Sequence, residues 1–315
     1  MTTALKPQWI KPGTILFAAT VPVNETAFRF ALAQATEFRA SLVIFHAYDT
    51  LAVTSSEASG ILYFDYDAAR HEAMKSLEPL AERARTAGVP CRIEVRTGLP
   101  AEQILAFAHD HAVDRIVMAT RSPGAIGKLF VGSVAEEVLR KAPIPVCVIG
   151  PNVVDGAYRR YAVRKVLCGI RKLVASTPVA TFAAEVAEQH QAHLTLLHII
   201  RPEQFRMVLA GHVAAQMERE LQAMLPSALA TVKTEPIVVL GDPADEILFR
   251  ARATLADLII LGAHEASTLA AVARSGVAYK VIASAECPVL TLSPAVLAAA
   301  TEASAKEEPY LAGVF

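Results

Sequence analysis

The chain of 315 residues lacks the features that mark several protein classes. Its longest apolar runs, such as LADLIILGA, have the length of a strand, and none approaches the roughly 20 residues of a membrane helix. The opening residues, MTTALKPQWIKPG, contain no apolar signal core. The 30 basic and 31 acidic residues nearly balance, so no basic excess points to nucleic acid. We therefore expect no membrane span, no nucleic-acid partner and a cytoplasmic location.

Motifs for catalysis and metal binding are also missing. No Gly-x-Gly-x-x-Gly follows a first strand, and Ser133 does not lie in a Gly-x-Ser-x-Gly elbow. His190 and His193 have a ligand-like spacing without a third ligand nearby, so we expect a solvated helix end rather than a metal site. For His109, Asp110 and His111 we likewise expect a solvated helix end rather than a metal site. The sequence thus predicts no catalytic residue and no metal.

Cysteine is scarce, and its placement indicates structural thiols. No two of the four cysteines have C-x-x-C spacing, and each lies in or beside a predicted strand. We expect buried, reduced thiols, which suit a cytoplasm. The four are Cys91, Cys147, Cys168 and Cys287.

Alternating strand and helix signals are abundant, and they occur twice in the same order. The first copy predicts strands at 15–20, 41–47, 91–96, 114–120 and 145–149, and helices at 24–38, 65–87, 100–109 and 132–142. The second copy repeats this programme from Val166 onward. The paired segments are ILFAAT with VLCGIR, LVIFHAY with LTLLHII, GLPAEQIL with GDPADEIL, DRIVMAT with DLIILGA, and IPVCVIGP with CPVLTLSP.

This co-linear matching indicates a tandem duplication. The offset is 152 residues between His46 and His198 and 143 from Gly98 and Gly241 onward, so the first copy carries nine extra residues between its second and third strands. Both histidines lie on apolar strands, and we expect hydrogen-bonded structural roles for them. The predicted divisions are an N-terminal extension (1–12), domain 1 (13–151), a linker (152–163), domain 2 (164–294) and a tail (295–315), for which we expect a frayed end.

The near-continuous apolar strands predict an α/β fold of two tandem doubly wound, Rossmann-like domains, each with a five-stranded parallel sheet flanked by helices. In such sheets ligands bind beyond the carboxyl ends of the strands, where the strand order reverses. The loops after the first and fourth strands of each copy are therefore the candidate site walls.

These residues resemble the universal stress protein family in a tandem, two-domain form. The resemblance rests on the strands LVIFHA and LTLLHI, the Gly-x-Pro-Ala turns at 98–101 and 241–244, and the strands DRIVM and DLIIL. The run GSVAEEVL at 132–139 and the close APIPV at 142–146 add to it. Single pieces are unspecific, but the ordered set occurs twice.

The resemblance implies a test for nucleotide binding. ATP-binding members of the family carry Gly-x-x-Gly, nine residues, then Gly-Ser or Gly-Thr, with an Asp at the end of the first strand. In the first copy this frame falls on Ala119, Ser122, Gly132 and Ser133, and the Asp position holds Thr20. In the second copy it falls on Gly262, Glu265, Ser275 and Gly276, with Arg171 in the Asp position.

The first copy is the better candidate for a ligand site. Its loop offers cationic partners and displaced glycines, whereas Glu265 places a negative charge where a triphosphate would lie. The candidate nucleotide- or ligand-binding residues are Thr20, Ala119, Arg121, Ser122, Gly124, Gly127, Lys128, Gly132 and Ser133.

Three interpretations compete. The first is a non-enzymatic stress-response or signalling protein that acts through a partner or ligand and retains a degenerate nucleotide site. The second is an ATP- or AMP-binding protein, or a slow ATP hydrolase, that uses the loop at 119–133. The third is a binder of an apolar or lipid-like ligand, suggested by the apolar helical stripe in 203–225, although core packing is the commoner meaning of such a stripe.

The resemblance also implies how the halves assemble. The closing strands, 145–149 and 288–292, would pair antiparallel across a pseudo-two-fold axis and so hide two sheet edges. One chain would then supply both halves of a dimer, with association of two chains into a homodimer still open. The protein partner, the ligand and the stress signal are not encoded in any motif.

Overall fold

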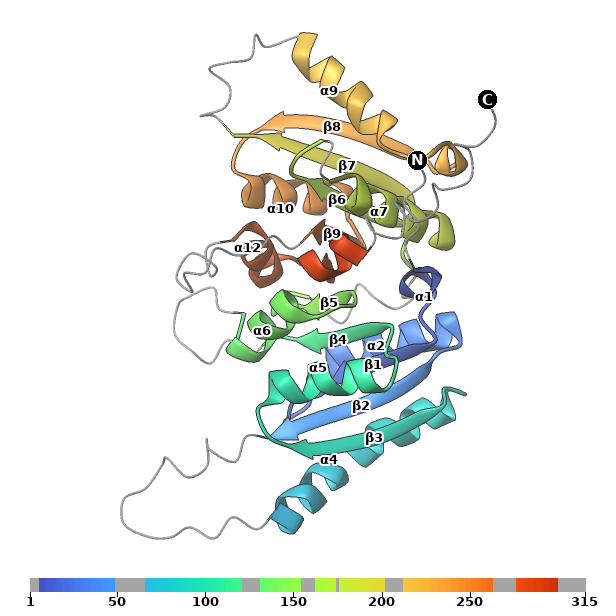
Figure 1. The fold of residues 1–315 in the computed structure, drawn as a ribbon, viewed down its shortest axis with the longest axis vertical. Coiled ribbons are helices and arrows are strands. Elements are labelled where there is room, and N and C mark those ends of the chain that lie inside the picture. Colours follow the sequence, from blue (N-terminus) through green and yellow to red (C-terminus); the bar gives the residue numbers. More distant parts are fainter. Residues whose placement is uncertain are drawn as a thin grey trace, which may run out of the picture.

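The computed structural model describes residues 6–48, 66–120, 131–153, 162–173, 176–201, 212–262 and 276–299. Their strands form one ten-stranded sheet in the order β3-β2-β1-β4-β5-β10-β9-β6-β7-β8 (Figure 1). The strands are β1 (Thr14–Ala18), β2 (Ser41–Tyr48), β3 (Cys91–Thr97), β4 (Arg115–Ala119), β5 (Val146–Ile149), β6 (Lys165–Ile170), β7 (His193–Ile200), β8 (Thr234–Leu240), β9 (Leu258–Gly262) and β10 (Val289–Leu292).

Helices cover both faces of this sheet, and each face has its own apolar core. One face carries α1 (Pro7–Ile10), α2 (Glu25–Phe38), α4 (Tyr66–Thr86), α7 (Thr177–His190) and α9 (His212–Ala223). The other carries α5 (Pro100–Asp110), α6 (Ser133–Lys141), α10 (Pro243–Thr254) and α12 (Val277–Ser284). The predicted fold class is confirmed, because each repeat contributes five strands that pair in parallel within it.

The two five-stranded halves join through β5 and β10, which pair antiparallel with Cys147 opposite Leu290. This is the predicted pairing of the closing strands, and it removes two apolar edges that would otherwise template association. On one face of the junction, the Tyr279 hydroxyl of α12 contacts the Glu136 carbonyl of α6 at 3.5 Å. Burial raises the pKa of Tyr279 and the Glu136 carboxylate raises it further, which keeps the hydroxyl a proton donor.

Equivalent positions of the two repeats meet across this junction in different ways. Ser293, just after β10, donates its hydroxyl to the Ala142 carbonyl at the end of α6, at 2.5 Å. Gly150, the matching residue after β5, approaches the end of α12 so closely that an added Cβ would lie 2.2 Å from the Ile282 carbonyl oxygen. The first repeat therefore needs glycine where the second uses serine.

The N-terminal extension is part of the junction on the other face. Trp9 of α1 is 2% exposed and belongs to the core shared with α2 and α7 (Figure 1). Its carbonyl accepts a hydrogen bond from Arg115 Nη2 at 2.7 Å, and Arg115 Nη1 donates to Gln34 Oε1 at 2.5 Å. Burial lowers the pKa of Arg115 to about 10, so this guanidinium remains charged at neutral pH.

The expectation of a solvated helix end at His190 is wrong. The His190 side chain is 4% exposed, with Nδ1 2.8 Å from Glu37 Oε1 and its ring against Phe38 of the first repeat. The helix ends of α2 and α7 face each other because the antiparallel junction of β5 and β10 relates the two repeats by an approximate two-fold rotation. The spacing of these residues along the sequence gives no sign of this contact.

The first residues of the tail belong to a short helix that no sequence signal predicts. Residues 294–299 are helical, and Val296 is fully buried in the core beside α7. The Ser293 hydroxyl accepts a hydrogen bond from the Val296 amide at 3.2 Å, which starts the helix as an N-cap does. The aromatic end of the tail lies outside the described residues.

Two aspartates explain the Asp-strand motif that occurs in both repeats. Asp114 Oδ2 accepts the amides of Gly13 and Thr14 at 2.8 and 2.9 Å. Asp257 Oδ2 accepts those of Arg164 and Lys165 at 2.8 and 2.9 Å. Each carboxylate thus binds the first amides of the central strand of its repeat. These amides lie at the end of the sheet opposite the carboxyl ends of the strands, where ligands bind in such folds.

The predicted thiols and apolar helical stripe pack largely as expected. Cys147, Cys168 and Cys287 are buried, whereas Cys91 is only half-buried. In the described part of the stripe, Leu221 is buried and Met224 packs on the same core, as core packing requires; residues 203–211 lie outside the described part.

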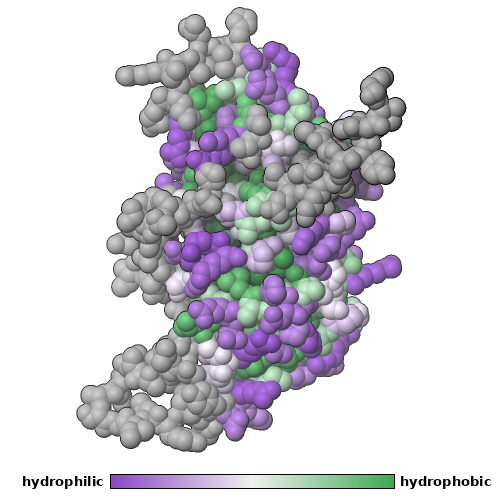
Figure 2. Space-filling model, in the orientation of Figure 1, coloured by the Kyte–Doolittle hydropathy of each residue, from purple (hydrophilic) through white to green (hydrophobic). Residues whose placement is uncertain are grey.

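No described helix is both long and apolar enough to cross a bilayer. Figure 2 shows hydrophilic residues over much of one face, with apolar residues in small groups between them.

One acidic group in α7 makes stability depend on pH. Burial, and secondarily the charge of Glu188, raise the pKa of Glu185 to about 7, against 4.5 in a free side chain. The folded state therefore holds this proton more tightly than the unfolded chain, and stability falls as pH rises from about 4.5 to about 7. Glu185→Gln is expected to stabilise the fold by about 1 to 2 kcal/mol at pH 8, allowing for partial exposure, and hardly at all near pH 4.

Urea unfolding of the Glu185→Gln variant at both pH values measures this difference. Glu188→Gln, on the exposed side of the same helix, is the matched control and is expected to change stability much less. An equal gain from Glu185→Gln at both pH values would contradict the assignment.

Candidate functional site

The candidate site lies at the carboxyl ends of the strands of the first repeat, called the edge of that repeat below, where β1, β4 and the start of α6 come together. β1 and β4 are adjacent and parallel, with Ala18 opposite Met118, so the residues that follow each strand lie side by side. Val131, just before α6, is buried on the same face of the sheet as Ala18 and Met118. Of the predicted residues, Thr20, Ala119, Gly132 and Ser133 are described. Arg121, Ser122, Gly124, Gly127 and Lys128 lie outside the described residues.

Two of the described residues have structural reasons for their identity. The Thr20 hydroxyl is exposed and donates to the Pro22 carbonyl at 2.8 Å, so it closes its own loop. Ala119 is half-buried and packs against the core beneath α2.

The start of α6 has the geometry of an anion site. Gly132 is its N-cap, with φ 62° and ψ 140°, a region that residues with a Cβ rarely adopt. Among the described residues no side chain caps the helix, and a Cβ placed on Gly132 would meet none of their atoms within 4 Å. The first amides of α6 thus have no described side-chain acceptor at the positive end of the helix dipole. Ser133 is exposed beside them.

Thr120 is a polar residue of this site that the motif frame missed. It directly follows β4 and is 4% exposed, yet its hydroxyl has no hydrogen-bond partner among the described residues. Side chains alternate along a strand, and Met118 lies in the core beneath α5 and α6. Thr120 therefore lies on the α6 face, where its hydroxyl is available to the site. Strand alternation was the signal that could have found it.

In the second repeat, side chains fill the space at the corresponding end of the strands. A Cβ on Gly262, the last residue of β9, would lie 3.0 Å from Val179 Cγ2 and 3.5 Å from Leu297 Cδ1. Leu297 belongs to the helical turn at the start of the tail. Gly276, the N-cap of α12, has ordinary extended backbone with φ −64°. Arg171 is exposed, and Glu265 and Ser275 lie outside the described residues.

The repeated histidines have the expected structural role at both edges. His46 Nδ1 lies 2.9 Å from the Ala19 carbonyl oxygen, and His198 Nδ1 lies 2.9 Å from that of Ile170. Since a carbonyl only accepts, Nδ1 carries the proton in both rings. Each histidine ties the end of the first strand of its repeat to the second strand. Among the described residues, no three histidine, cysteine or acidic side chains gather as a metal site would require.

One protein family matches both halves of the chain. The model of the universal stress protein family matches residues 13–150 and again residues 162–293. A universal stress protein of Thermus aquaticus is 34% identical over 120 residues, which cover 38% of this chain and 84% of that protein. One of Mycolicibacterium smegmatis is 23% identical over 288 residues, covering 86% of this chain and 93% of that protein.

Solved structures support the fold over nearly the whole chain. The crystal structure of a universal stress protein from Archaeoglobus fulgidus has a TM-score of 0.69 to this chain at 17% identity. The match covers 90% of this chain and 97% of that one. At this identity the likeness concerns the fold alone.

Proposed function

This chain belongs to the universal stress protein family, and from that premise we propose that it is a non-enzymatic tandem stress-response protein that acts by binding a partner or ligand. In this proposal the second repeat is a structural half, and any ligand at the candidate edge binds to the first repeat. The buried thiols suit work in a reducing cytoplasm.

The observation that carries this proposal is the closed edge of the second repeat. Leu297 and Val179 fill the space above Gly262, at the position where nucleotide-binding members keep the first glycine of their motif. A phosphate that approaches this backbone would have to displace both side chains. The first repeat also departs from the nucleotide pattern, since the Thr20 hydroxyl bonds to its own loop and Ala119 replaces a glycine.

A second candidate function is nucleotide binding by the first repeat, and three observations favour it. Within the described part of the chain, the N-terminus of α6 has no side-chain cap, a Cβ on Gly132 would meet no atom within 4 Å, and the buried Thr120 hydroxyl has no hydrogen-bond partner. Amides at a helix start together with a hydroxyl are what a phosphate requires. In this form of the function, AMP or ATP would be the ligand.

Calorimetric titration of the full chain with ATP and AMP separates the two functions. The ligand-independent form of the proposal predicts no binding in the micromolar range. Micromolar affinity for either nucleotide would contradict it and would establish the second candidate. Hydrolysis is followed in the same samples, and sustained phosphate release would contradict the non-enzymatic assignment.

If a nucleotide binds, Gly132→Ala is expected to weaken its binding about tenfold or more, because the added Cβ opposes the positive φ and re-aims the first amides of α6. Gly88→Ala is a matched control, since Gly88 also has positive φ, 77°, and open space around its Cβ position. It is expected to cost similar stability, about 1 to 2 kcal/mol, without changing affinity. A Gly132→Ala variant that binds as the wild type does would relocate the site.

A further inference from the structure

The two outermost strands of the described sheet are β3 in the first repeat and β8 in the second (Figure 1). The outer side of such a strand presents amide and carbonyl groups without a ladder partner, and another chain can add a strand there. The outer sides of β3 and β8 differ at one position that decides whether a strand can be added.

The hydrogen bonds between β2 and β3 fix which residues of β3 face outward. The Leu42 amide donates to the Pro90 carbonyl at 2.8 Å, and the Gly98 amide donates to the Tyr48 carbonyl at 3.1 Å. Because the backbone groups of a strand point alternately to its two sides, the even-numbered residues of β3 bond to β2. The amides and carbonyls that face outward are those of Cys91, Ile93, Val95 and Thr97.

The second repeat has a proline at one of the corresponding outward positions. The Gly241 amide donates to the Ile200 carbonyl at 3.1 Å, so the backbone groups of β8 alternate as those of β3 do. Pro236 of β8 therefore faces outward, at the position that Ile93 occupies in β3. Proline has no amide hydrogen and protects an outermost strand from pairing. β3 contains no proline, so every outward residue of this strand has an amide to donate.

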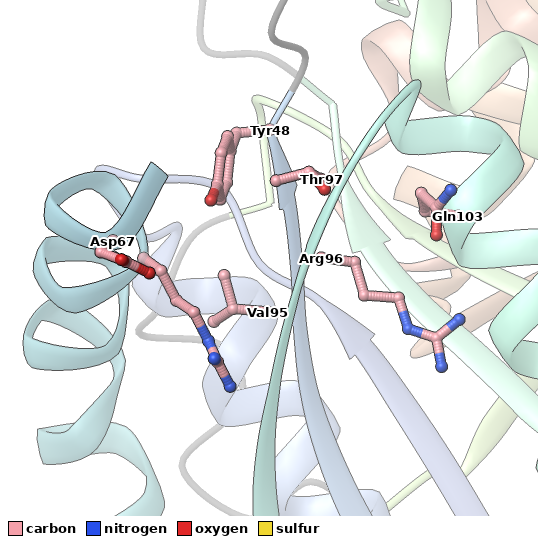
Figure 3. Close-up of a pocket in the computed structure, with 7 residues that line it drawn as sticks. Tyr48, Asp67, Val95, Arg96, Thr97 and Gln103 are labelled. Atoms are coloured by element: carbon pink, nitrogen blue, oxygen red, sulfur yellow. The ribbon is translucent and has the colours of Figure 1, made fainter. Parts of the chain in front are cut away.

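One face of β3 is apolar and lies beneath α4. Cys91, Ile93 and Val95 are partly buried there and pack against the core of that face. Figure 3 shows Val95 on the α4 side of the strand and Arg96 on the other side. Side chains on one face of neighbouring strands pack against each other. Apolar residues are therefore favoured on the α4 face of an added strand.

The other face of β3 carries one positive charge without an ionic partner. Arg96 Nε lies 2.9 Å from Glu94 Oε1, so these two charges are paired. Arg92 is exposed, with its guanidinium carbon 5.3 Å from the centre of the Phe107 ring, and it forms no ion pair with any described residue. Opposite charges on neighbouring strands stabilise their pairing. An acidic side chain is therefore favoured on this face of an added strand.

The position of α4 opposes a second copy of β3 as the added strand. α4 packs mainly on β3, and Figure 1 shows it running along that strand. Antiparallel pairing of β3 with β3 of another copy would place two α4 helices on one face, over strands only about 4.8 Å apart. Packed helices need about 8 to 10 Å between their axes. An extended peptide brings no helix of its own and avoids this clash.

We propose that the outer side of β3 binds an extended peptide segment of a partner protein, which pairs with β3 as a further strand of the sheet. The segment has apolar residues on the α4 face and an acidic residue that pairs with Arg92 on the α5 face. The second repeat has no such site, because Pro236 blocks the pairing and Glu235 replaces Arg92.

This proposal rests on the partner-binding function proposed above and gives that function a surface. The outer side of β3 is separate from the candidate edge at the ends of β1 and β4. The peptide experiment can therefore fail without contradicting the proposed function, which the nucleotide titration tests.

The test uses the full chain and a heptapeptide with blocked ends, Thr-Val-Glu-Val-Glu-Val-Thr, which has valine on one face and glutamate on the other when extended. The readout is hydrogen exchange of single amides, observed by NMR. Saturating peptide is expected to slow exchange of the outward amides of β3 about tenfold or more. The amides of β3 that already bond to β2 are expected to change little. Binding through side chains alone would not produce this alternation.

Two changes in the peptide separate backbone pairing from charge attraction. N-methylation of alternate residues is expected to abolish binding when the methyl groups face β3 and to preserve it when they face away, so only one of the two methylated peptides binds. Replacement of both glutamates by lysine is expected to weaken binding about fivefold, because the charge beside Arg92 is then repulsive.

Two substitutions transfer residues of β8 to β3. Ile93→Pro removes an outward amide and no hydrogen bond to β2, so the strand is expected to form as β8 does with Pro236, and peptide binding is expected to fall about tenfold or more. Arg92→Glu, at an exposed position, is expected to reverse the preference between the glutamate and lysine peptides. Glu235→Arg in β8 is the matched control and is expected to leave binding unchanged, because Pro236 still blocks that strand.

Slowed exchange of the outward amides that is lost in Ile93→Pro, together with the reversed preference in Arg92→Glu, establishes the site. The absence of saturable binding by the glutamate peptide would overturn the proposal, as would equal binding of the two methylated peptides or unchanged binding in both variants. Slowed exchange of the same amides in the free chain that increases with protein concentration would assign this side of β3 to a second copy and would also overturn it.

Discussion

Gly150→Ala is expected to destabilise the protein by about 3 kcal/mol or more, because a Cβ at this glycine would overlap backbone atoms. The added carbon would lie 2.2 Å from the Ile282 carbonyl oxygen and 3.8 Å from that of Ala285. Both oxygens belong to backbone at the end of α12, so no side chain can rotate away. Relief requires β5 and α12 to separate, and these elements hold the two repeats together.

Equilibrium urea unfolding followed by circular dichroism measures this loss. Ser293→Ala is the matched control, because Ser293 occupies the equivalent place in the second repeat and loses only the hydrogen bonds of its hydroxyl. We expect that control to cost about 1 to 2 kcal/mol. If Gly150→Ala costs no more than Ser293→Ala, the close approach of the two repeats described above is wrong.

Trp9→Ala is expected to cost about 3 to 5 kcal/mol, the range for removal of a large aromatic side chain from a core. Trp9 is 2% exposed and lies between the first repeat and α7 of the second. Its loss would leave a cavity at the junction and loosen the segment whose carbonyl accepts from the buried Arg115. The N-terminal extension is thus expected to be required for stability.

Thermal and urea unfolding by circular dichroism test this expectation. Lys6→Ala is the control, because the Lys6 ammonium lies 5.3 Å over the Trp9 ring but is exposed, and we expect a cost below about 1 kcal/mol. The wild type offers an independent readout, since Trp9 is the single tryptophan of the chain and its fluorescence should report unfolding of the junction. A Trp9→Ala variant of wild-type stability would show that α1 merely rests on the surface.

Local sequence signals predicted most elements closely. Asn24 was expected to begin a helix, and its side chain does accept the Ala27 amide at the start of α2. The helix predicted at 65–87 is α4, which ends at Thr86 and is followed by Gly88 at positive φ. These succeed because caps and turns depend on residues a few positions apart. The internal repeat supplied the rest, since each strand could be checked against its partner copy.

The candidate site was predictable only in part. The motif frame located Gly132 and Ser133 at the start of α6, because a glycine before a helix has a local meaning. It missed Thr120, whose importance comes from burial without a partner, and it missed Leu297, which closes the second edge.

The sequence by itself determined the two-copy organisation, the parallel doubly wound sheets and the membership of the family, because these depend on periodicity and order along the chain. Only the tertiary structure decided how the surroundings of equivalent residues differ between the copies. His190 is buried against Glu37, Leu297 closes the edge beside Gly262, and Asp242 caps a helix start that Leu99 leaves open. The physical reason is that the burial, charge pairing and accessibility of a group depend on its neighbours in space, and the antiparallel joining of β5 to β10 brings together residues more than a hundred positions apart.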